Sequence, residues 1–128
     1  MRRFIPVLAV AALAALGLSA CTKQLEAPTD TGVCWHMVSL PGGKVRFNKL
    51  AQNVPSLEKC AAALEAMRLH FNAFGQSNDQ MIGAYQGQFL FLQPEGIFTS
   101  KTLNGGRYVL LVRTGDGRLA KPGEMPIQ

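Results

Sequence analysis

Residues 81–92 read Met-Ile-Gly-Ala-Tyr-Gln-Gly-Gln-Phe-Leu-Phe-Leu, and this stretch decides the fold. Its β-prone composition predicts one long strand, in which successive side chains point to opposite faces. One face then carries Gly83, Tyr85, Gly87, Phe89 and Phe91. The other carries Ile82, Ala84, Gln86, Gln88, Leu90 and Leu92. Because the carboxyl half is apolar on both faces, we expect the sheet to be covered on both sides.

The segments around this stretch also read as strands. A turn at residues 93–96, a strand at 97–102, a turn at 104–106 and a strand at 107–113 complete a three-stranded meander. Upstream, the apolar residues 33–40, the turn Pro41-Gly42-Gly43 and the alternating residues 44–48 predict a hairpin. In its second strand Val45 and Phe47 share one face, so the opposite face should be wet.

A helix is predicted between the hairpin and the meander. Apolar residues recur there at spacings of three and four, which gathers them into one stripe: Leu57, Cys60, Ala61, Leu64, Met67, Phe71 and Phe74. Asn53 or Ser56 can cap its start, and Gly75 suits its end. The element order predicts an α+β fold: a small antiparallel sheet, made of the N-terminal hairpin and the three-stranded meander, with one amphipathic helix packed on one face.

The amino terminus reads as an export signal. Met1-Arg2-Arg3 is basic, and residues 4–20 are uncharged and rich in Ala and Leu. The end of this run, Leu18-Ser19-Ala20-Cys21, resembles the lipobox of bacterial lipoprotein precursors. That resemblance covers residues 1–21 only, and it implies cleavage before Cys21 and lipidation of its sulfur. An uncleaved membrane anchor and a soluble secreted product are the alternatives.

The cysteine count agrees with the lipoprotein interpretation. The chain has three cysteines, and reserving Cys21 for lipid leaves Cys34 and Cys60 as an even pair. A disulfide between them is expected in an oxidising compartment. By the loop-entropy argument it would contribute about 3 to 4 kcal/mol.

These features divide the chain into four parts. Residues 1–20 form the signal peptide, 21–32 the lipidated cysteine with a flexible tether, 33–114 the α+β domain, and 115–128 an irregular C-terminal tail. Loss of the leader removes two of the 13 cationic residues and lowers the net charge from +5 to about +3. This mild excess suits anionic lipid, and no basic run with interleaved aromatic residues points to nucleic acid.

Candidate binding residues lie in the stretch that decides the fold. Its glycines flank Tyr85 and predict either an aromatic-floored groove or, as we favour, close packing of the alanine-rich helix or a bulge. The candidate interaction surface consists of Tyr85, Gln86, Gln88, Leu90 and Leu92. The second apolar face should be covered by the hairpin or the tail, with a partner protein or self-association as the alternative.

No catalytic or metal-binding pattern stands out, so we assign no catalytic residue, metal or cofactor. His36 and His70 share no local metal motif, and Cys60 near a helix start lacks the Cys-x-x-Cys partner of redox enzymes. Asp116 lies between two glycines and reads as a turn. Phosphate loops, nucleophile elbows and HExxH motifs are missing from the sequence.

The sequence therefore predicts a membrane-tethered envelope lipoprotein with a small, non-catalytic binding or accessory domain. Thr22, rather than Asp, follows Cys21, which favours the outer membrane, facing the periplasm. Expected partners are the membrane, through the lipid anchor, and an envelope protein or peptidoglycan. A small hydrolase acting on a cell-wall polymer and a purely structural envelope protein remain open; a buried acid with a strongly shifted pKa in a cleft would mark the enzyme.

Overall fold

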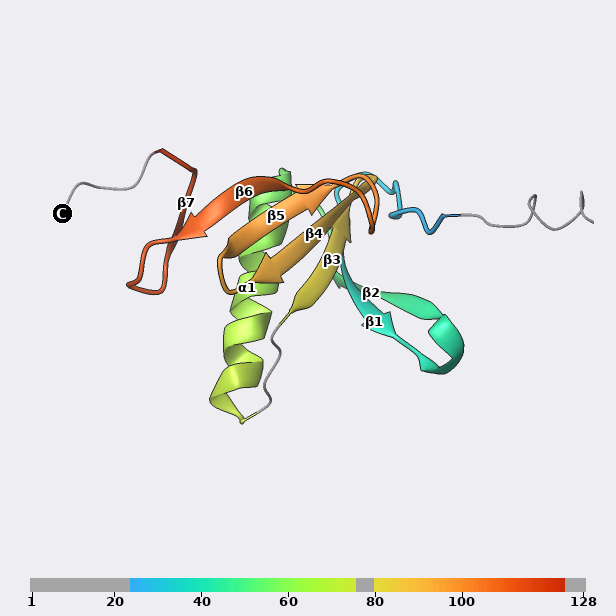
Figure 1. The fold of residues 1–128 in the computed structure, drawn as a ribbon, viewed down its shortest axis with the longest axis horizontal. Helices are drawn as coiled ribbons and strands as arrows, with labels where there is room; N and C mark the ends of the chain where they lie inside the picture. The colour runs from blue at the N-terminus through green and yellow to red at the C-terminus, as the bar shows by residue number, and fades with distance from the viewer. Residues whose placement is uncertain (1–23, 76–79, 124–128) are drawn as a thin grey trace, which may run out of the picture.

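The computed structural model describes residues 24–75 and 80–123, and these form one antiparallel sheet of seven strands with one α-helix. The strands are β1 (Cys34–Ser39), β2 (Val45–Ala51), β3 (Met81–Tyr85), β4 (Gln88–Gln93), β5 (Gly96–Ser100), β6 (Tyr108–Arg113) and β7 (Leu119–Ala120). The helix α1 spans Leu57–Ala73, and a 3-10 turn, η2 (Pro41–Gly43), joins β1 to β2. The strand order is β2-β1-β3-β4-β5-β6-β7, with α1 behind the sheet in Figure 1. The predicted α+β class is confirmed.

The long strand predicted for residues 81–92 is wrong, because the chain reverses at Gln86 and Gly87. Both residues have positive φ, 44° and 86°, as a two-residue hairpin turn of the I′ type requires. Tyr85 therefore pairs with Gln88 across the hairpin, and Gly83 pairs with Leu90. The turn changes the faces: Tyr85 now shares a side with Leu90, whereas the single-strand prediction placed them on opposite sides.

The C-terminal segment is more regular than predicted. β7 pairs with β6, with Val112 opposite Ala120 and Arg113 opposite Leu119. Together with the hairpin at Gln86, this strand lengthens the meander from the three strands predicted to five, β3 to β7. Residues 121–123 follow without further secondary structure, and residues 124–128 lie outside the described residues.

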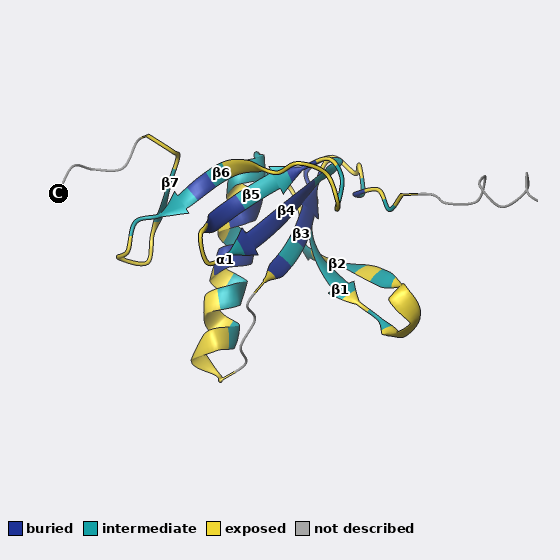
Figure 2. Cartoon of the chain, viewed as in Figure 1, coloured by how far each residue is buried: buried dark blue, intermediate teal, exposed yellow. Residues whose placement is uncertain are grey.

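The helix begins and ends where local signals place it. The Ser56 side chain accepts a hydrogen bond from the Lys59 N–H (3.2 Å), and Gly75 follows the last turn with φ of 80°. Its buried stripe packs on β3 and β4. Figure 2 shows that the carboxyl half of α1 projects beyond the sheet and is exposed or only partly buried. For this reason Phe74, predicted to be on the buried stripe, is 72% exposed.

Gly83 explains how closely α1 approaches the sheet. A Cβ at this position would collide with the Leu64 side chain of α1 and lie 2.7 Å from the backbone oxygen of Trp35. The expectation that glycine permits close helix packing is confirmed here, although the partner is Leu64 rather than one of the helix alanines. The core on this side contains Cys34, Cys60, Ala61, Leu64, Met81, Tyr85, Leu90, Leu92, Ile97 and Leu111.

The other side of the sheet is covered by the chain itself, in part. Phe89 and Phe91 are fully buried there, beneath side chains of the β1–β2 hairpin and of the residues that precede it. Ala27 is only 5% exposed, and the Gly87 N–H donates to the Pro28 oxygen (2.8 Å). Part of residues 24–32 therefore packs on the sheet, within the segment for which the sequence predicts a flexible tether. The packed chain begins before residue 33 and continues past residue 114.

The β1–β2 hairpin forms an arm that departs from the rest of the sheet. β1 pairs with β2 along its whole length but with β3 only through Cys34, Trp35 and His36. Figure 1 shows the hairpin tip turned away from β3. Val45 and Phe47 are half-buried while Arg46 and Asn48 are exposed, which confirms the predicted wet face.

The described chain contains no helix with the length and hydropathy needed to cross a bilayer.

Candidate functional site

The five residues predicted to form an interaction surface are separated by the turn at Gln86. Tyr85, Leu90 and Leu92 are buried between the sheet and α1, with exposures of 5%, 0% and 0%, so they offer no surface. Gln86 is exposed, and its Oε1 accepts a hydrogen bond from the Gly32 N–H (2.7 Å). Gln88 alone borders an open groove.

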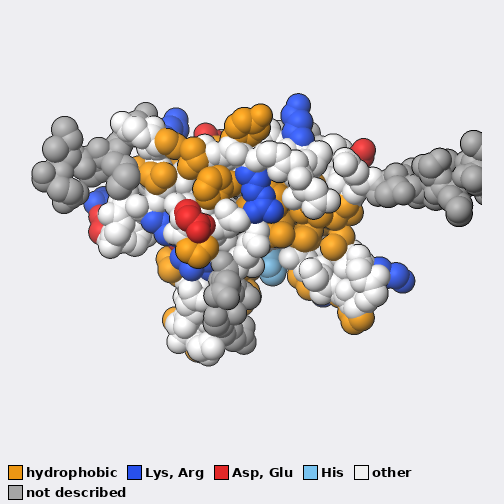
Figure 3. All heavy atoms as spheres, in the orientation of Figure 1, with side chains coloured by type: hydrophobic (Ala, Val, Ile, Leu, Met, Phe, Trp, Pro, Cys, Tyr) orange, Lys and Arg blue, Asp and Glu red, His pale blue; other side chains and the backbone are white. Residues whose placement is uncertain are grey.

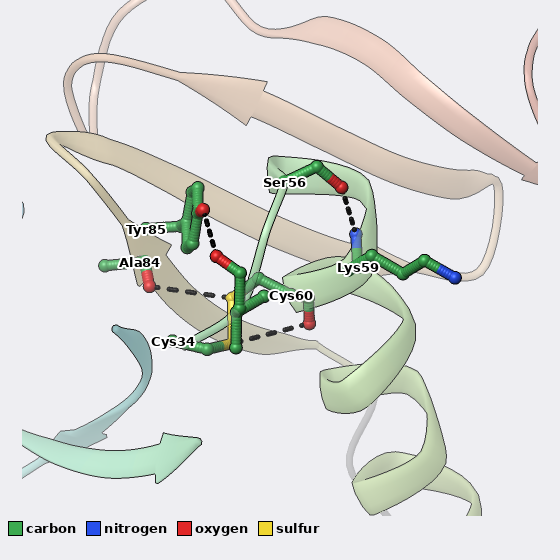
Figure 4. The surroundings of a disulfide bond; sticks show 7 residues. Cys34, Ser56, Lys59, Cys60, Ala84 and Tyr85 are labelled. Atoms are coloured by element: carbon green, nitrogen blue, oxygen red, sulfur yellow. Dashed lines mark hydrogen bonds between the residues drawn. A yellow bond between two sulfur atoms is a disulfide. The ribbon is translucent and has the colours of Figure 1, made fainter. Parts of the chain in front are cut away.

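The predicted disulfide between Cys34 and Cys60 is present and ties β1 to the first turn of α1. Both cysteines are fully buried, with Cα atoms 5.4 Å apart. Figure 4 shows Tyr85 next to the bridge, where its hydroxyl donates to the Val54 oxygen (2.6 Å) just before the helix. The sulfurs are joined and shielded, so this pair stabilises the fold and offers no thiol for catalysis. Tyr85 has the same structural role.

A polar groove of about 440 Å³ lies where β4 begins, β5 ends and β6 begins. The strand register explains why its lining residues meet. Gln88 and Leu90 lie on the same face of β4. Leu90 pairs with Thr99 of β5, and Thr99 pairs with Tyr108 of β6. The groove is lined by Gln88, Thr99, Ser100, Lys101, Thr102, Gly106 and Tyr108. We call it the Gln88–Tyr108 groove.

Hydrogen bonds within the groove fix several of its polar groups. The Thr99 hydroxyl lies 2.9 Å from both Gln88 Oε1 and the Phe89 oxygen. This contact uses the Gln88 amide oxygen as an acceptor, and the NH₂ group of the same amide is a further donor among the residues that line the groove. Ser100 Oγ accepts from the Thr102 N–H (3.2 Å), so the groove floor is held by its own loop.

The opening of the groove combines a charge with an aromatic ring. Tyr108 is 73% exposed, and Lys101 is exposed beside it in the lining. No carboxylate, imidazole or thiol belongs to the lining that the structure describes. The groove can therefore donate hydrogen bonds, attract an anion and stack on a ring-shaped ligand, but it has no evident acid–base pair. Of the residues that line the groove, the sequence predicted only Gln88. The polar run Thr99-Ser100-Lys101-Thr102, which follows the apolar pair Ile97 and Phe98, could have indicated the others.

A second hollow, of about 290 Å³, opens where β1 and β3 diverge and includes His36. Burial lowers the pKa of His36 below its ordinary value of 6.5, so the ring is neutral at neutral pH. This hollow also contains Gln80, which adjoins residues 76–79, outside the described residues. We therefore assign no site there.

The described chain contains one buried acid with a strongly shifted pKa, Glu65, which is not among the apolar residues of the predicted helical stripe. Glu65 is 6% exposed and accepts paired hydrogen bonds of 2.9–3.0 Å from Arg68 and from Arg113 of β6. Burial by itself raises its pKa, but the hydrogen bonds and charges of the two arginines outweigh burial and lower the pKa to about 2. Arg113 also donates to the backbone oxygens of Gln93 and Pro94.

This arrangement gives Glu65 a structural role. Its carboxylate is ionised at all physiological pH values, and four guanidinium N–H groups occupy both oxygens, so it cannot serve as a general acid. It lies between α1 and the β4–β6 side of the sheet and not in either hollow. The sequence analysis named a buried acid with a strongly shifted pKa in a cleft as the sign of an enzyme. Glu65 is such an acid, but it does not lie in a described cleft.

The remaining polar candidates lie at the periphery. Asp116 is exposed in the β6–β7 turn, and hydrogen bonds from the side chains of Arg118 and Thr114 hold its pKa well below the usual range. His70 is exposed on α1 with its ring edge-on to Phe74, 4.8 Å between centroids. Among residues 24–75 and 80–123, no group of three His, Cys, Asp or Glu side chains is placed to hold a metal ion.

A scan against protein-family models and searches of curated proteins and of solved structures found no match.

Proposed function

We propose that this protein is a membrane-tethered envelope lipoprotein whose small domain binds a ligand and does not catalyse a reaction. Lipidation of Cys21 would anchor it, most naturally in the outer membrane and facing the periplasm. The Cys34–Cys60 bridge supports this address, because disulfides persist in oxidising compartments. The bridge also leaves Cys21 as the one unpaired cysteine of the chain.

The Gln88–Tyr108 groove is the proposed binding site, and the composition of its lining carries the proposal. An amide, three hydroxyl side chains and an exposed phenol suit a ligand rich in hydroxyl and amide groups, such as a glycan. The exposed Tyr108 ring offers a stacking surface for a sugar. Lys101 adds attraction for a carboxylate, so a cell-wall polymer that joins sugars to acidic peptides, as peptidoglycan does, fits the groove best.

Co-sedimentation with isolated cell-wall sacculi tests this proposal. The acylated protein in detergent should sediment with sacculi, and Tyr108→Ala should weaken binding by about tenfold, the effect of losing about 1.4 kcal/mol. Lys101→Glu should also weaken it, more strongly at low salt. Lys121→Glu, which changes an exposed cation after β7, is the matched control.

Two results would overturn the binding proposal. One is wild-type protein that stays in the supernatant, and the other is retention of full binding by both groove variants. Release of soluble fragments from sacculi by the protein alone would instead favour the cell-wall hydrolase. The anchor is tested separately by intact mass of membrane-extracted protein, which should lack residues 1–20 and carry acyl groups on Cys21.

A further inference from the structure

The side of the sheet opposite α1 carries an apolar patch that the chain covers only in part. Around buried Phe89 and Phe91 lie seven half-buried apolar side chains, which we call the second-face patch: Leu25, Trp35, Met37, Phe47, Ile82, Phe98 and Leu103. Figure 3 looks onto this side and shows apolar atoms gathered between the β1–β2 hairpin and the body of the sheet. No described helix covers this side, since α1 lies on the other.

We propose that the second-face patch rests on the surface of the bilayer to which the chain is anchored. This inference rests on the proposed acylation of Cys21. Leu25, which packs in the patch, follows Cys21 by four residues, and four residues span at most about 14 Å. An acylated Cys21 lies at the level of the lipid headgroups, so it holds Leu25, one member of the patch, within about that distance of the membrane.

The patch has the residue types that favour a membrane interface. Trp35 lies within it, and tryptophan is enriched where headgroups meet acyl chains. Lys49 Nζ lies 5.9 Å from the Trp35 ring, and the Arg107 guanidinium lies 3.6 Å from the Phe91 ring. Both residues are exposed and their cationic groups lie over the patch, so they can meet anionic headgroups there.

The indole N–H of Trp35 lacks a hydrogen-bond acceptor among the described residues. Its Nε1–H is buried and has no partner in the described chain. A buried donor without a partner destabilises the conformation that holds it, because the donor has lost its hydrogen bond to water. A small tilt of the ring toward the headgroup region would supply carbonyl and phosphate oxygens as acceptors. The bilayer therefore complements the patch in apolarity, charge and hydrogen bonding together.

Fluorescence quenching tests this inference, because Trp35 is the one tryptophan of the chain. The acylated protein is reconstituted into vesicles of phosphatidylcholine and phosphatidylglycerol, with or without lipids brominated near the headgroup end of their acyl chains. Trp35 should lose a large fraction of its emission in the brominated vesicles. A matched control moves the probe to the other side: Leu69→Trp in a Trp35→Phe background places an indole on α1, where it should keep its emission.

The outcomes separate this inference from the proposed function. Protein that is acylated and floats with the vesicles, yet shows equal Trp35 emission with and without bromine, overturns the inference and leaves the anchor standing. The same result accompanied by crosslinking of two chains through the patch would assign the patch to a second copy. An unmodified Cys21 would overturn both. Lys49→Glu and Arg107→Glu should each reduce quenching in anionic vesicles, whereas Lys59→Glu on α1 should not.

Discussion

Replacing Glu65 by glutamine tests whether the ion pairs of Glu65 with Arg68 and Arg113 stabilise the fold. The substitution keeps the side-chain shape and removes the charge that Arg68 and Arg113 share. Removing one partner of a buried ion pair costs about 3 to 5 kcal/mol. The arginine side chains retain 18% and 22% exposure and water can replace part of the lost interaction, so we expect a loss of about 2 to 3 kcal/mol at neutral pH.

The pH dependence gives a second, independent measure. The pKa of Glu65 falls from its ordinary value of 4.5 to about 2 on folding, because the arginines outweigh the effect of burial. A carboxyl with a lower pKa in the folded state adds stability that is complete above about pH 4.5 and is lost as the pH falls toward 2. That difference corresponds to about 3 kcal/mol at most. The stability gap between wild type and Glu65→Gln should therefore close over this pH range.

Urea unfolding followed by tryptophan fluorescence at a series of pH values measures both quantities. Glu26→Gln, at an exposed position, is the control and should change stability little. A gap below about 0.5 kcal/mol at neutral pH would refute the structural role of Glu65. A gap that stays constant from neutral pH to about pH 2 would refute the pKa argument, because it would mean that Glu65 titrates alike in both states.

Three further predictions concern stability and use the same unfolding assay. Gly83→Ala should destabilise the protein by about 1 to 3 kcal/mol, because the added methyl group overpacks the contact with α1. Gly106→Ala is the control and should be nearly neutral, because a Cβ there meets open space. Equal effects of the two substitutions would contradict the close approach of α1. Replacing Cys34 and Cys60 together by alanine should cost about 3 to 4 kcal/mol, and an unchanged urea midpoint would rule out the bridge. Gly87→Ala should cost about 1 to 2 kcal/mol because φ is 86° there, and a neutral effect would contradict the two-residue turn.

The structure changes how the candidate residues bear on function. Tyr85, Leu90 and Leu92, which the alternating pattern offered as a surface, build the core beneath α1. Gln88 remains a candidate: Thr99 of β5 donates a hydrogen bond to its side chain, and Tyr108 of β6 pairs with Thr99. The proposed binding site is therefore defined by strand register more than by any motif.

Local sequence was sufficient where the structure depends on neighbours in the chain. Ser56 and Gly75 mark the ends of α1 because capping is satisfied within one turn. Alternation predicted the wet face of β2, and the count of three cysteines predicted the pairing of Cys34 with Cys60. The proposed lipidation of Cys21 rests on sequence alone and stays a prediction, since Cys21 lies outside the described residues.

Tertiary structure decided what depends on how distant segments meet. An apolar run with period two fits one long strand or two short ones, and only pairing of Tyr85 with Gln88 showed that the chain turns at Gln86. The burial of Glu65 depends on Arg113, which lies 48 residues away and reaches it only through the packing of α1 on the sheet. The tether was predicted because this segment lacks hydrophobic periodicity and contains Pro28 and Gly32, yet Leu25 and Ala27 find an apolar surface to pack on around Phe89 and Phe91. A sequence shows which side chains need burial, but the register and the remaining open faces determine where that burial occurs.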